Sequence, residues 1–347
     1  MINCLSWIGR CVAAIGLATL AAACAANPLN VPVLERDFAD PHIIEHEGEY
    51  LAYATNRGLN LPMARSTDLV NWELVRDPAR PGKLLDGMPK LASWVKEGRT
   101  WAPEVMEIGG RWLLYYTAHH ARKDIQCIGI AAADAPTGPF RDTSDAPLLC
   151  QEQLGGTIDA NPFRDTDGQL YLYYKNDGNN PAVLKPSYLW AHRLSPDGMR
   201  LVGDPAPLVK NDVHWEWRVV EAPAMVRRPD GGYTLFFSAN HYGWETDQRL
   251  SNYGTGYAQC VGPMGPCTDA PENPILHSYN KKGIGCLSGP GHPTVFSTGG
   301  KSYVAFHAWS ATKGCRKLDN ERFLYVAPLA WQDGKPVIGA SLRPTEK

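Results

Sequence analysis

The stretch that decides the fold is residues 219–240, with the sequence VVEAPAMVRRPDGGYTLFFSAN. It predicts a short strand, a turn over the Pro-Asp-Gly-Gly segment at 229–232, and a second strand rich in aromatic residues. One carboxylate, Glu221, stands just ahead of the Ala-Pro pair that opens the first strand. The same plan of a proline-marked strand, a glycine turn and an aromatic strand occurs in four other places.

The other four copies are recognised by the dipeptides Asp40-Pro41, Ala102-Pro103, Asn161-Pro162 and His292-Pro293. Aromatic runs follow them at 50–53, 112–116, 171–174 and 303–306. Successive marker prolines, beginning with Pro41, are 62, 59, 61 and 70 residues apart. A supersecondary unit repeated at nearly constant spacing is typical of propeller blades. We therefore predict an all-β protein, a five-bladed β-propeller, in which residues 27–347 form a single catalytic domain.

The composition sets limits on the class of protein and its partners. Of the 347 residues, 44% are hydrophobic and 10% aromatic, which is ample material for a packed core. The formal net charge is −2 and the chain has no basic run, so the electrostatic footprint of a nucleic-acid binder is missing from the sequence. The sequence also has no glycine-rich phosphate loop and no Gly-x-Ser-x-Gly motif, which disfavours nucleotide chemistry and serine hydrolysis.

The N-terminus predicts export. Arg10 precedes an apolar, alanine-rich run at 11–26 that is too short to span a bilayer, so residues 1–26 are interpreted as a signal peptide. Residues 21–24, Ala-Ala-Ala-Cys, also resemble a loose lipobox, in which Cys24 would be lipidated. Ordinary cleavage and a lipid anchor at Cys24 both stay open. The predicted location is periplasmic, extracellular or the outer surface, with no membrane span.

Six cysteines remain after the signal, and an even number in an exported chain predicts disulfide bonds. Fifteen pairings are formally open. The most economical one closes a loop inside each blade and joins Cys127 to Cys150, Cys260 to Cys267, and Cys286 to Cys315. A metal site of cysteines is not predicted, because the sequence holds no Cys-x-x-Cys pair.

Three carboxylates stand at or near the marker positions, namely Asp40, Asp159 and Glu221. The innermost strands of a propeller begin at one end of the central channel, so these side chains are expected to share one pocket. Carboxylates crowded together repel one another, and burial raises the pKa of at least one of them. A protonated and an ionised carboxyl in one pocket is what glycoside hydrolysis requires. The alternative is that each simply opens a turn, but three in register favour the functional interpretation.

Four short motifs carry a resemblance to a known family, in the order Asp40-Pro41-His42, Trp101-Ala102-Pro103-Glu104, Thr157-Ile158-Asp159-Ala160 and Val220-Glu221-Ala222-Pro223. Their order and spacing resemble glycoside hydrolase family 43, the five-bladed propeller glycosidases, over nearly the whole mature chain. The resemblance implies an inverting mechanism with Asp40 as general base and Glu221 as general acid. It implies that Asp159 adjusts the pKa of the acid and orients it.

Two expectations concern this pair of carboxyls. An inverting enzyme holds its base and acid roughly 6.5–9.5 Å apart to admit a water molecule, and an origin in blades one and four suits that separation. The sequence neighbours of Glu221 are Val219, Val220 and Ala222, and an apolar setting would favour its protonated form.

Further side chains are candidates for binding the sugar. Trp101 is expected either to stack on the sugar or to pack in the core, and Trp215 either to flank the sugar or to lie along a strand edge. His292 and Arg322 are further candidates for substrate binding. In related propellers a histidine such as His292 lines the channel and contacts a structural calcium ion through water. No cofactor is expected to be required and no direct metal ligand is predicted.

The resemblance implies a substrate among arabinose- and xylose-containing plant cell-wall polysaccharides. An exo-acting α-L-arabinofuranosidase is the first choice, with β-xylosidase and endo-arabinanase as alternatives within the family. Whether the site is a pocket or a groove depends on loops such as 80–96 and 244–253. A non-catalytic carbohydrate-binding propeller is the alternative from another class.

Overall fold

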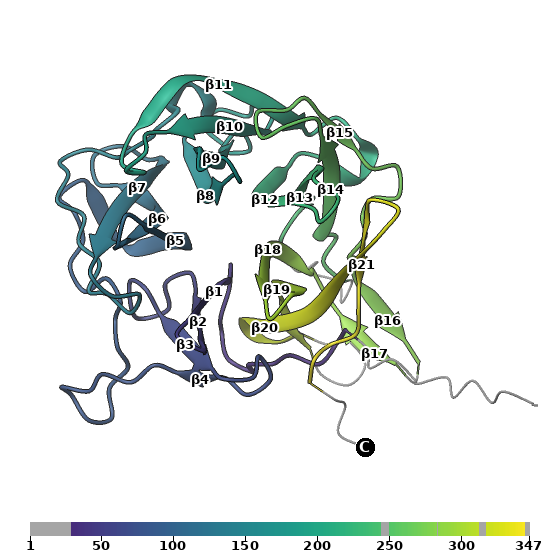
Figure 1. Cartoon of the computed structure of the whole chain (residues 1–347), viewed down its shortest axis with the longest axis horizontal. Coiled ribbons are helices and arrows are strands. Elements are labelled where there is room, and N and C mark those ends of the chain that lie inside the picture. The colour runs from purple at the N-terminus through teal and green to yellow at the C-terminus, as the bar shows by residue number, and fades with distance from the viewer. Residues whose placement is uncertain (1–28, 244–249, 283, 312–316, 344–347) are drawn as a thin grey trace, which may run out of the picture.

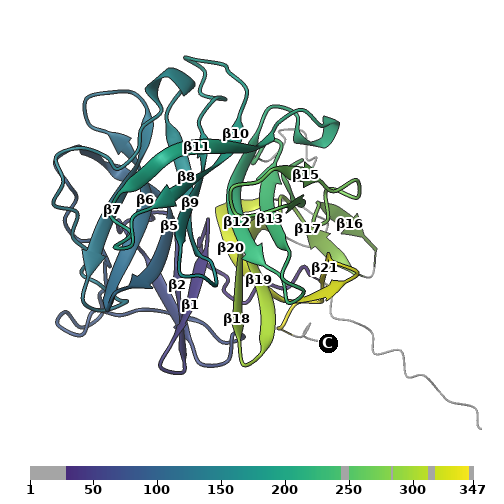
Figure 2. The ribbon, with the colours of Figure 1, turned by 45° about the horizontal axis from the view of Figure 1, so that its top comes forward.

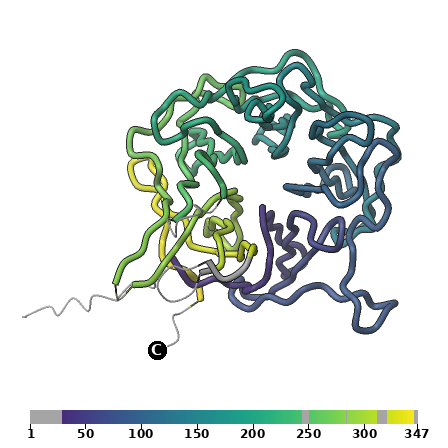
Figure 3. Tube along the Cα trace, turned by 180° about the vertical axis from the view of Figure 1, so that it is seen from behind, coloured from purple at the N-terminus to yellow at the C-terminus, as the bar shows by residue number. Residues whose placement is uncertain are grey.

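The computed structural model describes residues 29–243, 250–282, 284–311 and 317–343. The predicted signal peptide, with Cys24, lies outside the described residues. Five β-sheets stand around a central axis as the blades of a propeller, and each sheet presents its first strand to the axis (Figure 1). The chain passes once around the ring, from purple at the start to yellow at the end (Figure 3). The predicted all-β, five-bladed propeller is therefore confirmed.

The strands follow one another in chain order and pair antiparallel within each blade. Blade one holds β1 (His42–His46), β2 (Glu49–Tyr53), β3 (Met63–Ser66) and β4 (Glu73–Leu74). Blade two holds β5 (Val95–Ile108), β6 (Arg111–His120) and β7 (Gln126–Ala133). Blade three holds β8 (Thr157–Arg164), β9 (Leu170–Asn176), β10 (Tyr188–Leu194) and β11 (Leu201–Lys210). Blade four holds β12 (Val220–Arg227), β13 (Tyr233–Ala239), β14 (Gly254–Cys260) and β15 (Cys267–Asp269). Blade five holds β18 (Gly291–Thr298), β19 (Lys301–Ala311), β20 (Lys317–Gln332) and β21 (Lys335–Ile338).

Smaller elements fill the connections. The hairpin of β16 (Tyr279–Lys281) and β17 (Gly285–Leu287) precedes blade five. Two single turns of 3-10 helix, η1 (Glu152–Leu154) and η2 (His214–Glu216), lead into blades three and four. Among the described residues, no helix has the length and apolar character needed to cross a membrane.

The aromatic runs seen in the sequence form the second strands of the blades, and they are buried because both faces of a blade pack against neighbouring blades. Every residue of β9 is buried. Leu51 of blade one and Tyr116 of blade two share one core cluster with Trp94. Tyr173 of blade three and Leu235 of blade four share another. The hydrophobic core is therefore a ring of inter-blade layers, which is why one domain accommodates so long a chain.

The ring is closed where the N-terminal lead-in meets blade five. Leu34 forms a β-bridge with Leu324 of β20, and the Phe38 amide donates to the Arg322 carbonyl at 2.7 Å. As a result β1 and β18, the first strands of blades one and five, come side by side (Figures 1 and 2). This closure carries Asp40, two residues after Phe38, to the mouth of the channel.

An irregularity at the start of each inner strand fixes the register of the repeats. At this point of each blade one residue has a left-handed backbone, and in blades two to five it lies where the pairing with the second strand shifts. These residues are Asp40, Ala102, Asp159, Ala222 and His292, with φ between 45° and 58°. The proline marker of blade three is therefore wrong, because Asp159-Ala160 and not Asn161-Pro162 is equivalent to the other dipeptides. Glu221 also lies within β12, rather than ahead of it.

Further along the channel, a polar network joins the inner strands. Glu104 of β5 contacts His42 of blade one at 2.7 Å, accepts from Asn161 of blade three at 3.2 Å and from Thr294 of blade five at 3.4 Å. Asn161 in turn accepts from the Met225 amide of blade four at 3.2 Å. All five blades are thus cross-linked by side chains with mutually compatible hydrogen-bonding groups.

Two of the predicted disulfide bonds are confirmed, Cys127–Cys150 and Cys260–Cys267. The first joins β7 to the loop before η1, and the second closes the outer hairpin of blade four. Cys286 is also disulfide-bonded, while its predicted partner Cys315 lies outside the described residues.

Candidate active site

The three predicted carboxylates line one cavity of about 510 Å³. Asp40 comes from the segment just before β1, Asp159 from β8 and Glu221 from β12, so blades one, three and four each contribute one acid. The cavity lies at the end of the ring where the inner strands begin. Its size is within the range of small-molecule binding sites. The structure thus brings together the three side chains that the repeat spacing predicts to converge.

Asp40 is surrounded by hydrogen-bond donors and positive charge. Arg322 Nη1 donates to Oδ1 at 3.0 Å, and the Thr55 hydroxyl donates to Oδ2. His292 Nδ1 lies 3.4 Å from Oδ1. Burial raises the pKa of Asp40, but Arg322 and His292 outweigh burial and hold the pKa well below its ordinary value. Asp40 is therefore an ionised carboxylate at neutral pH.

A buried histidine fixes the backbone of Asp40. The Asp40 amide donates to His307 Nδ1 at 3.1 Å, and the His307 side chain is 1% exposed. Burial and the neighbouring Arg322 lower the pKa of His307 to about 4, so its ring is neutral. Because Nδ1 accepts the amide hydrogen, it has no hydrogen of its own for Asp40 Oδ1, which lies 3.3 Å away. His307 therefore positions the backbone of Asp40 and adds no charge.

The Glu221 carboxylate contacts polar groups on both sides. Lys175 Nζ, at the end of β9, donates to Oε2 at 2.9 Å, and the Tyr253 hydroxyl donates to Oε1 at 2.7 Å. Burial raises the pKa of Glu221, but Lys175 and Tyr253 outweigh burial and leave the pKa below its ordinary value. The expectation of an apolar setting is therefore wrong, because the side chains adjacent in sequence are not the ones that surround this carboxylate.

Asp159 is the carboxyl whose pKa is raised. Its Oδ2 accepts the Ala222 amide at 2.9 Å, and its own amide donates to Thr117 Oγ1 at 3.0 Å. Burial raises the pKa of Asp159 to about 7, and the neighbouring Glu221 charge adds to the increase. Asp159 and Glu221 are electrostatically coupled, so the pair holds a proton near neutral pH while Asp40 does not.

The predicted sugar-binding residues separate into two groups. Trp101, His292 and Arg322 line the cavity, although His292 and Arg322 are turned toward Asp40. Trp215 is not one of the described residues that line the cavity. Its ring packs instead on Phe237, with the ring centroids 5.6 Å apart. The structure therefore places Trp215 in the core of blade four and not at the sugar site.

Sequence reasoning missed four contacts of the carboxylates, namely Thr55, Thr117, Lys175 and Tyr253. The first three share a detectable signal, since each is the first polar residue after the aromatic run of its blade's second strand. Tyr253 gives no such signal, because it lies in the connection before β14 and reaches Glu221 only through the fold.

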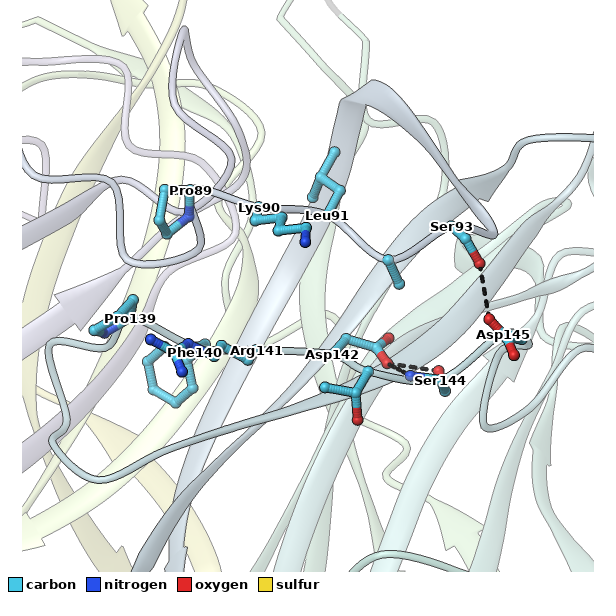
Figure 4. Close-up of a pocket in the computed structure, with 12 residues that line it drawn as sticks. Pro89, Lys90, Leu91, Ser93, Pro139, Phe140, Arg141, Asp142, Ser144 and Asp145 are labelled. Atoms are coloured by element: carbon cyan, nitrogen blue, oxygen red, sulfur yellow. Dashed lines mark hydrogen bonds between the residues drawn. The ribbon is translucent and has the colours of Figure 1, made fainter.

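A larger hollow, of about 800 Å³, lies between segments 89–93 and 139–145 beside blade two (Figure 4). Its central acid, Asp142, accepts hydrogen bonds from the Trp94 indole, the Tyr116 hydroxyl and Ser144. The Asp142 carboxylate is thus committed to holding the loop. The three predicted carboxylates lie in the smaller cavity.

One acidic cluster could hold a cation among the described residues. Asp212, Glu216 and Asp269 bring carboxylate oxygens within 4.8 Å of one another beside η2. The calcium ion predicted for the central channel stays a prediction, as does contact of His292 with such an ion through water.

A sequence profile described as "Glycosyl hydrolases family 43" matches residues 29–336. The chain belongs to this family. The match covers the five blades together and includes the segments that carry Asp40, Asp159 and Glu221.

The relatives include one named as an endo-acting enzyme and one named as an exo-acting enzyme. An extracellular endo-α-(1→5)-L-arabinanase of Bacillus subtilis is 24% identical over 77% of this chain and 64% of its own length. The chain thus spans less than two-thirds of that relative. An extracellular exo-α-(1→5)-L-arabinofuranosidase of Cellvibrio japonicus is 22% identical over 88% of this chain and 86% of its own. The crystal structure of a thermostable family-43 glycoside hydrolase is 28% identical, with a TM-score of 0.75 over 92% of this chain and 98% of that one.

Proposed function

We propose that this family-43 protein is an inverting glycoside hydrolase of arabinose- and xylose-containing plant polysaccharides. The observation that carries the proposal is the division of charge in the cavity. Arg322 and His292 keep Asp40 ionised, whereas the coupled Asp159–Glu221 pair retains a proton. Inverting hydrolysis needs one carboxylate to activate water and one carboxylic acid to protonate the leaving oxygen.

In the proposed mechanism, Asp40 is the general base and Glu221 the general acid. Asp40 accepts a proton from a water molecule as the water oxygen attacks the anomeric carbon. The glycosidic bond breaks, and its oxygen takes the proton of Glu221. Asp159 holds the Ala222 amide next to Glu221 and adjusts the pKa of the acid through their shared charge. Trp101, partly exposed on the cavity wall, offers a face on which the sugar ring stacks.

α-L-Arabinofuranosidase is the proposed activity. The near-complete match in length to the Cellvibrio exo-enzyme supports this choice, as does the single cavity that contains the three acids. Endo-arabinanase is the second candidate, because another hollow of about 360 Å³ shares Thr55, Trp101, Tyr242 and Arg322 with the cavity and would extend it. Part of the predicted loop 244–253, namely residues 244–249, lies outside the described residues. β-Xylosidase is the remaining alternative.

We further propose that the protein is exported. The two arabinan-cutting relatives are named extracellular, and the first 26 residues read as a signal. A lipid anchor at Cys24 is part of this proposal, and mass spectrometry of the mature N-terminus would test it. A protein that keeps residues 1–26 would contradict the proposed export signal.

The proposed activity is tested with nitrophenyl α-L-arabinofuranoside and β-xyloside, and with linear arabinan. Glu221→Gln is expected to lower kcat by about 10²–10⁴ on substrates with a poor leaving group, because it removes the acid. Proton NMR of the first product should show the inverted anomer. Unchanged turnover of linear arabinan in Glu221→Gln would overturn the acid role. Binding of pentose oligomers by a wild-type protein that hydrolyses none of them would identify a carbohydrate-binding propeller instead.

A further inference from the structure

Each left-handed residue at the start of an inner strand has an amide that needs an acceptor, and all five find it in the preceding blade. In four of the five, the acceptor is the first polar residue after the aromatic run of that blade's second strand. The pairs are Asp40 with His307, Ala102 with Thr55, Asp159 with Thr117, and His292 with Ser238, at 2.7–3.1 Å. The propeller thus has a repeated latch between neighbouring blades, built from one amide and one side-chain acceptor.

Blade three departs from this pattern. The equivalent residue of its second strand is Lys175, which pairs with Ile158 as Thr117 pairs with Trp101. An ammonium group has three donors and no lone pair, so it cannot accept the Ala222 amide. The amide donates instead to Asp159 Oδ2 at 2.9 Å. Asp159 of blade three therefore accepts the amide of blade four. In the other four latches a hydroxyl or an imidazole is the acceptor.

Lys175, which stands where the other blades have an acceptor, also sets the charge next to Glu221. The Lys175 side chain is 0% exposed, and its ammonium lies 2.9 Å from Glu221 Oε2 and 3.4 Å from Asp177 Oδ1. A buried ammonium must be paired with a negative charge to remain in the fold. Burial lowers the pKa of Lys175, but the Glu221, Asp177 and Asp159 carboxylates raise it above its ordinary value. Lys175 is therefore a permanent cation at the Glu221 carboxylate.

We infer that Lys175 is a positioning residue that holds Glu221 as a carboxylate in the free enzyme, so that the proton of the acid pair resides on Asp159. The catalytic part of this inference rests on the proposed hydrolase function. When the acid acts, the pair must pass one proton from Asp159 to Glu221, and Glu221 gives one to the leaving oxygen. Asp159 is then ionised and recovers its proton from solvent after the product leaves.

The inference is tested by titrating the protein labelled with ¹³C at its Asp and Glu carboxyl carbons. In wild type, the carboxyl that titrates near 7 should disappear in Asp159→Asn and persist in Glu221→Gln. In Lys175→Met, the Glu221 resonance should titrate about 1–3 pH units higher than in wild type, because an adjacent opposite charge is lost. Lys175→Arg, which keeps the charge, should leave it close to the wild-type value.

Lys335→Met is the matched control, since it removes an ammonium that pairs with Glu272 on the surface and should not move the Glu221 titration. Two results overturn the inference: a Glu221 titration that is the same in Lys175→Met and wild type, or a wild-type titration near 7 that belongs to Glu221. The assignment of the wild-type titration near 7 needs no Lys175 variant. It therefore tests the inference even if Lys175→Met does not fold. An inactive wild type with the expected titrations would overturn the proposed hydrolase function alone.

The pH dependence of kcat/KM adds a catalytic readout that a purely structural role would not move. The part of the pH profile that reflects ionisation of the Asp159–Glu221 pair should shift in Lys175→Met. It should remain in place in Lys335→Met. Lys175→Thr introduces the hydroxyl that Thr55 and Thr117 supply in their blades. If the latch is as described, this variant should free Asp159 from the Ala222 amide and move the Asp159 resonance. An unmoved resonance in the folded variant would contradict the latch.

Discussion

Arg322 Nη1 lies 3.0 Å from Asp40 Oδ1, and the Arg322 guanidinium carbon lies 5.9 and 5.8 Å from the ring centroids of Tyr242 and Trp309. The cation is thus in cation–π range of two rings while its Nη1 donates to the carboxylate. A guanidinium held in this way supplies directed hydrogen bonding that a flexible ammonium would not reproduce. Arg322 is one of three blade-five residues, with His292 and His307, that contact the base of blade one.

The first prediction is that Arg322→Gln lowers kcat/KM and raises the pKa of Asp40. Loss of an opposite charge at hydrogen-bond distance raises a carboxylate pKa by about 1–3 units, so the acidic limb of the pH–rate profile should move to higher pH. The measurement is kcat/KM against pH on an aryl arabinofuranoside. Arg65→Gln, which removes an exposed pair with Glu73, is the control and should keep the wild-type profile. An unmoved acidic limb in Arg322→Gln would show that Asp40 is not the titrating base.

The repeat explains how much of this site could be predicted. Convergence of Asp40, Asp159 and Glu221 follows from their positions in the blades, so the sequence alone indicated one pocket. The blade-three register did not follow, because Pro162 lies three residues past the bulge residue Asp159, and the left-handed backbone at Asp159 leaves no mark in the sequence. A proline is a good marker only where it immediately follows the bulge residue.

The protonation states were beyond sequence reasoning for a different reason. Adjacent residues on a strand point to opposite faces, so Val220 and Ala222 say little about what surrounds the Glu221 carboxylate. Its partners, Lys175 and Tyr253, are 46 and 32 residues away along the chain. The fold brings Lys175 from blade three, and Tyr253 from the connection before β14 of blade four, to the Glu221 carboxylate. The pKa of an acid in a propeller channel is therefore a property of the ring and not of the motif that contains the acid.

The second prediction concerns the close contact between Gly291 and Tyr253. A Cβ atom at position 291 would lie 2.0 Å from Tyr253 Cε1, so Gly291→Ala must displace the ring whose hydroxyl binds Glu221. Overpacking of this kind costs about 1–3 kcal/mol in the free energy of unfolding, and kcat should fall with it. Chemical denaturation and turnover measure the two effects. Gly262→Ala places its methyl group in open space and should change neither. Wild-type turnover in Gly291→Ala would contradict a role for the Tyr253 contact.

The third prediction concerns the network across the channel. The His42 and Glu104 side chains are 13% and 6% exposed and lie 2.7 Å apart, so Glu104→Gln or His42→Gln removes one partner of a buried pair. Either change should lower the free energy of unfolding by about 3 kcal/mol. Because Glu104 also accepts from blades three and five, the whole ring should lose stability in one transition. Urea unfolding followed by tryptophan fluorescence measures this loss, and His277→Gln, at an exposed histidine, is the control.

The contribution of the His42–Glu104 pair to the free energy of unfolding depends on pH, and its direction can be stated. Burial lowers the pKa of His42, but the Glu104 carboxylate outweighs burial and raises the pKa above its ordinary value of 6.5. The folded state therefore binds the proton more tightly than the unfolded state. The stabilisation is complete below pH 6.5 and is lost as the pH rises through the folded-state pKa. The wild type should lose this stabilisation above pH 6.5 and His42→Gln should not, so parallel curves for the two proteins would contradict the assignment.

The last prediction concerns Glu216, whose side chain is fully buried beside Asp269 and Asp212. Its Oε2 accepts the amides of Asp212 and Val213 at 3.0 Å, while Oε1 has no hydrogen-bond donor within the described part of the chain. Burial raises the pKa of Glu216 to about 8 and that of Asp269 to about 6. At neutral pH the pair is therefore expected to retain a proton between two carboxyls that would otherwise repel each other.

A raised carboxyl pKa stabilises the fold at low pH, and this stabilisation is lost as the pH rises from 4.5, the ordinary value for Glu216, through about 8. Glu216→Gln keeps an oxygen to accept the two amides but cannot ionise, so its free energy of unfolding should fall less between pH 5 and pH 9 than that of wild type. The measurement is denaturant unfolding across this range with a chelator present, because a divalent cation bound by the three carboxylates would offset their repulsion. Glu97→Gln, at an exposed position, should keep the wild-type slope. If wild type and Glu216→Gln lose the same stability in chelator, the buried carboxyl does not titrate in this range. If added calcium restores the wild type alone, the cluster is a cation site.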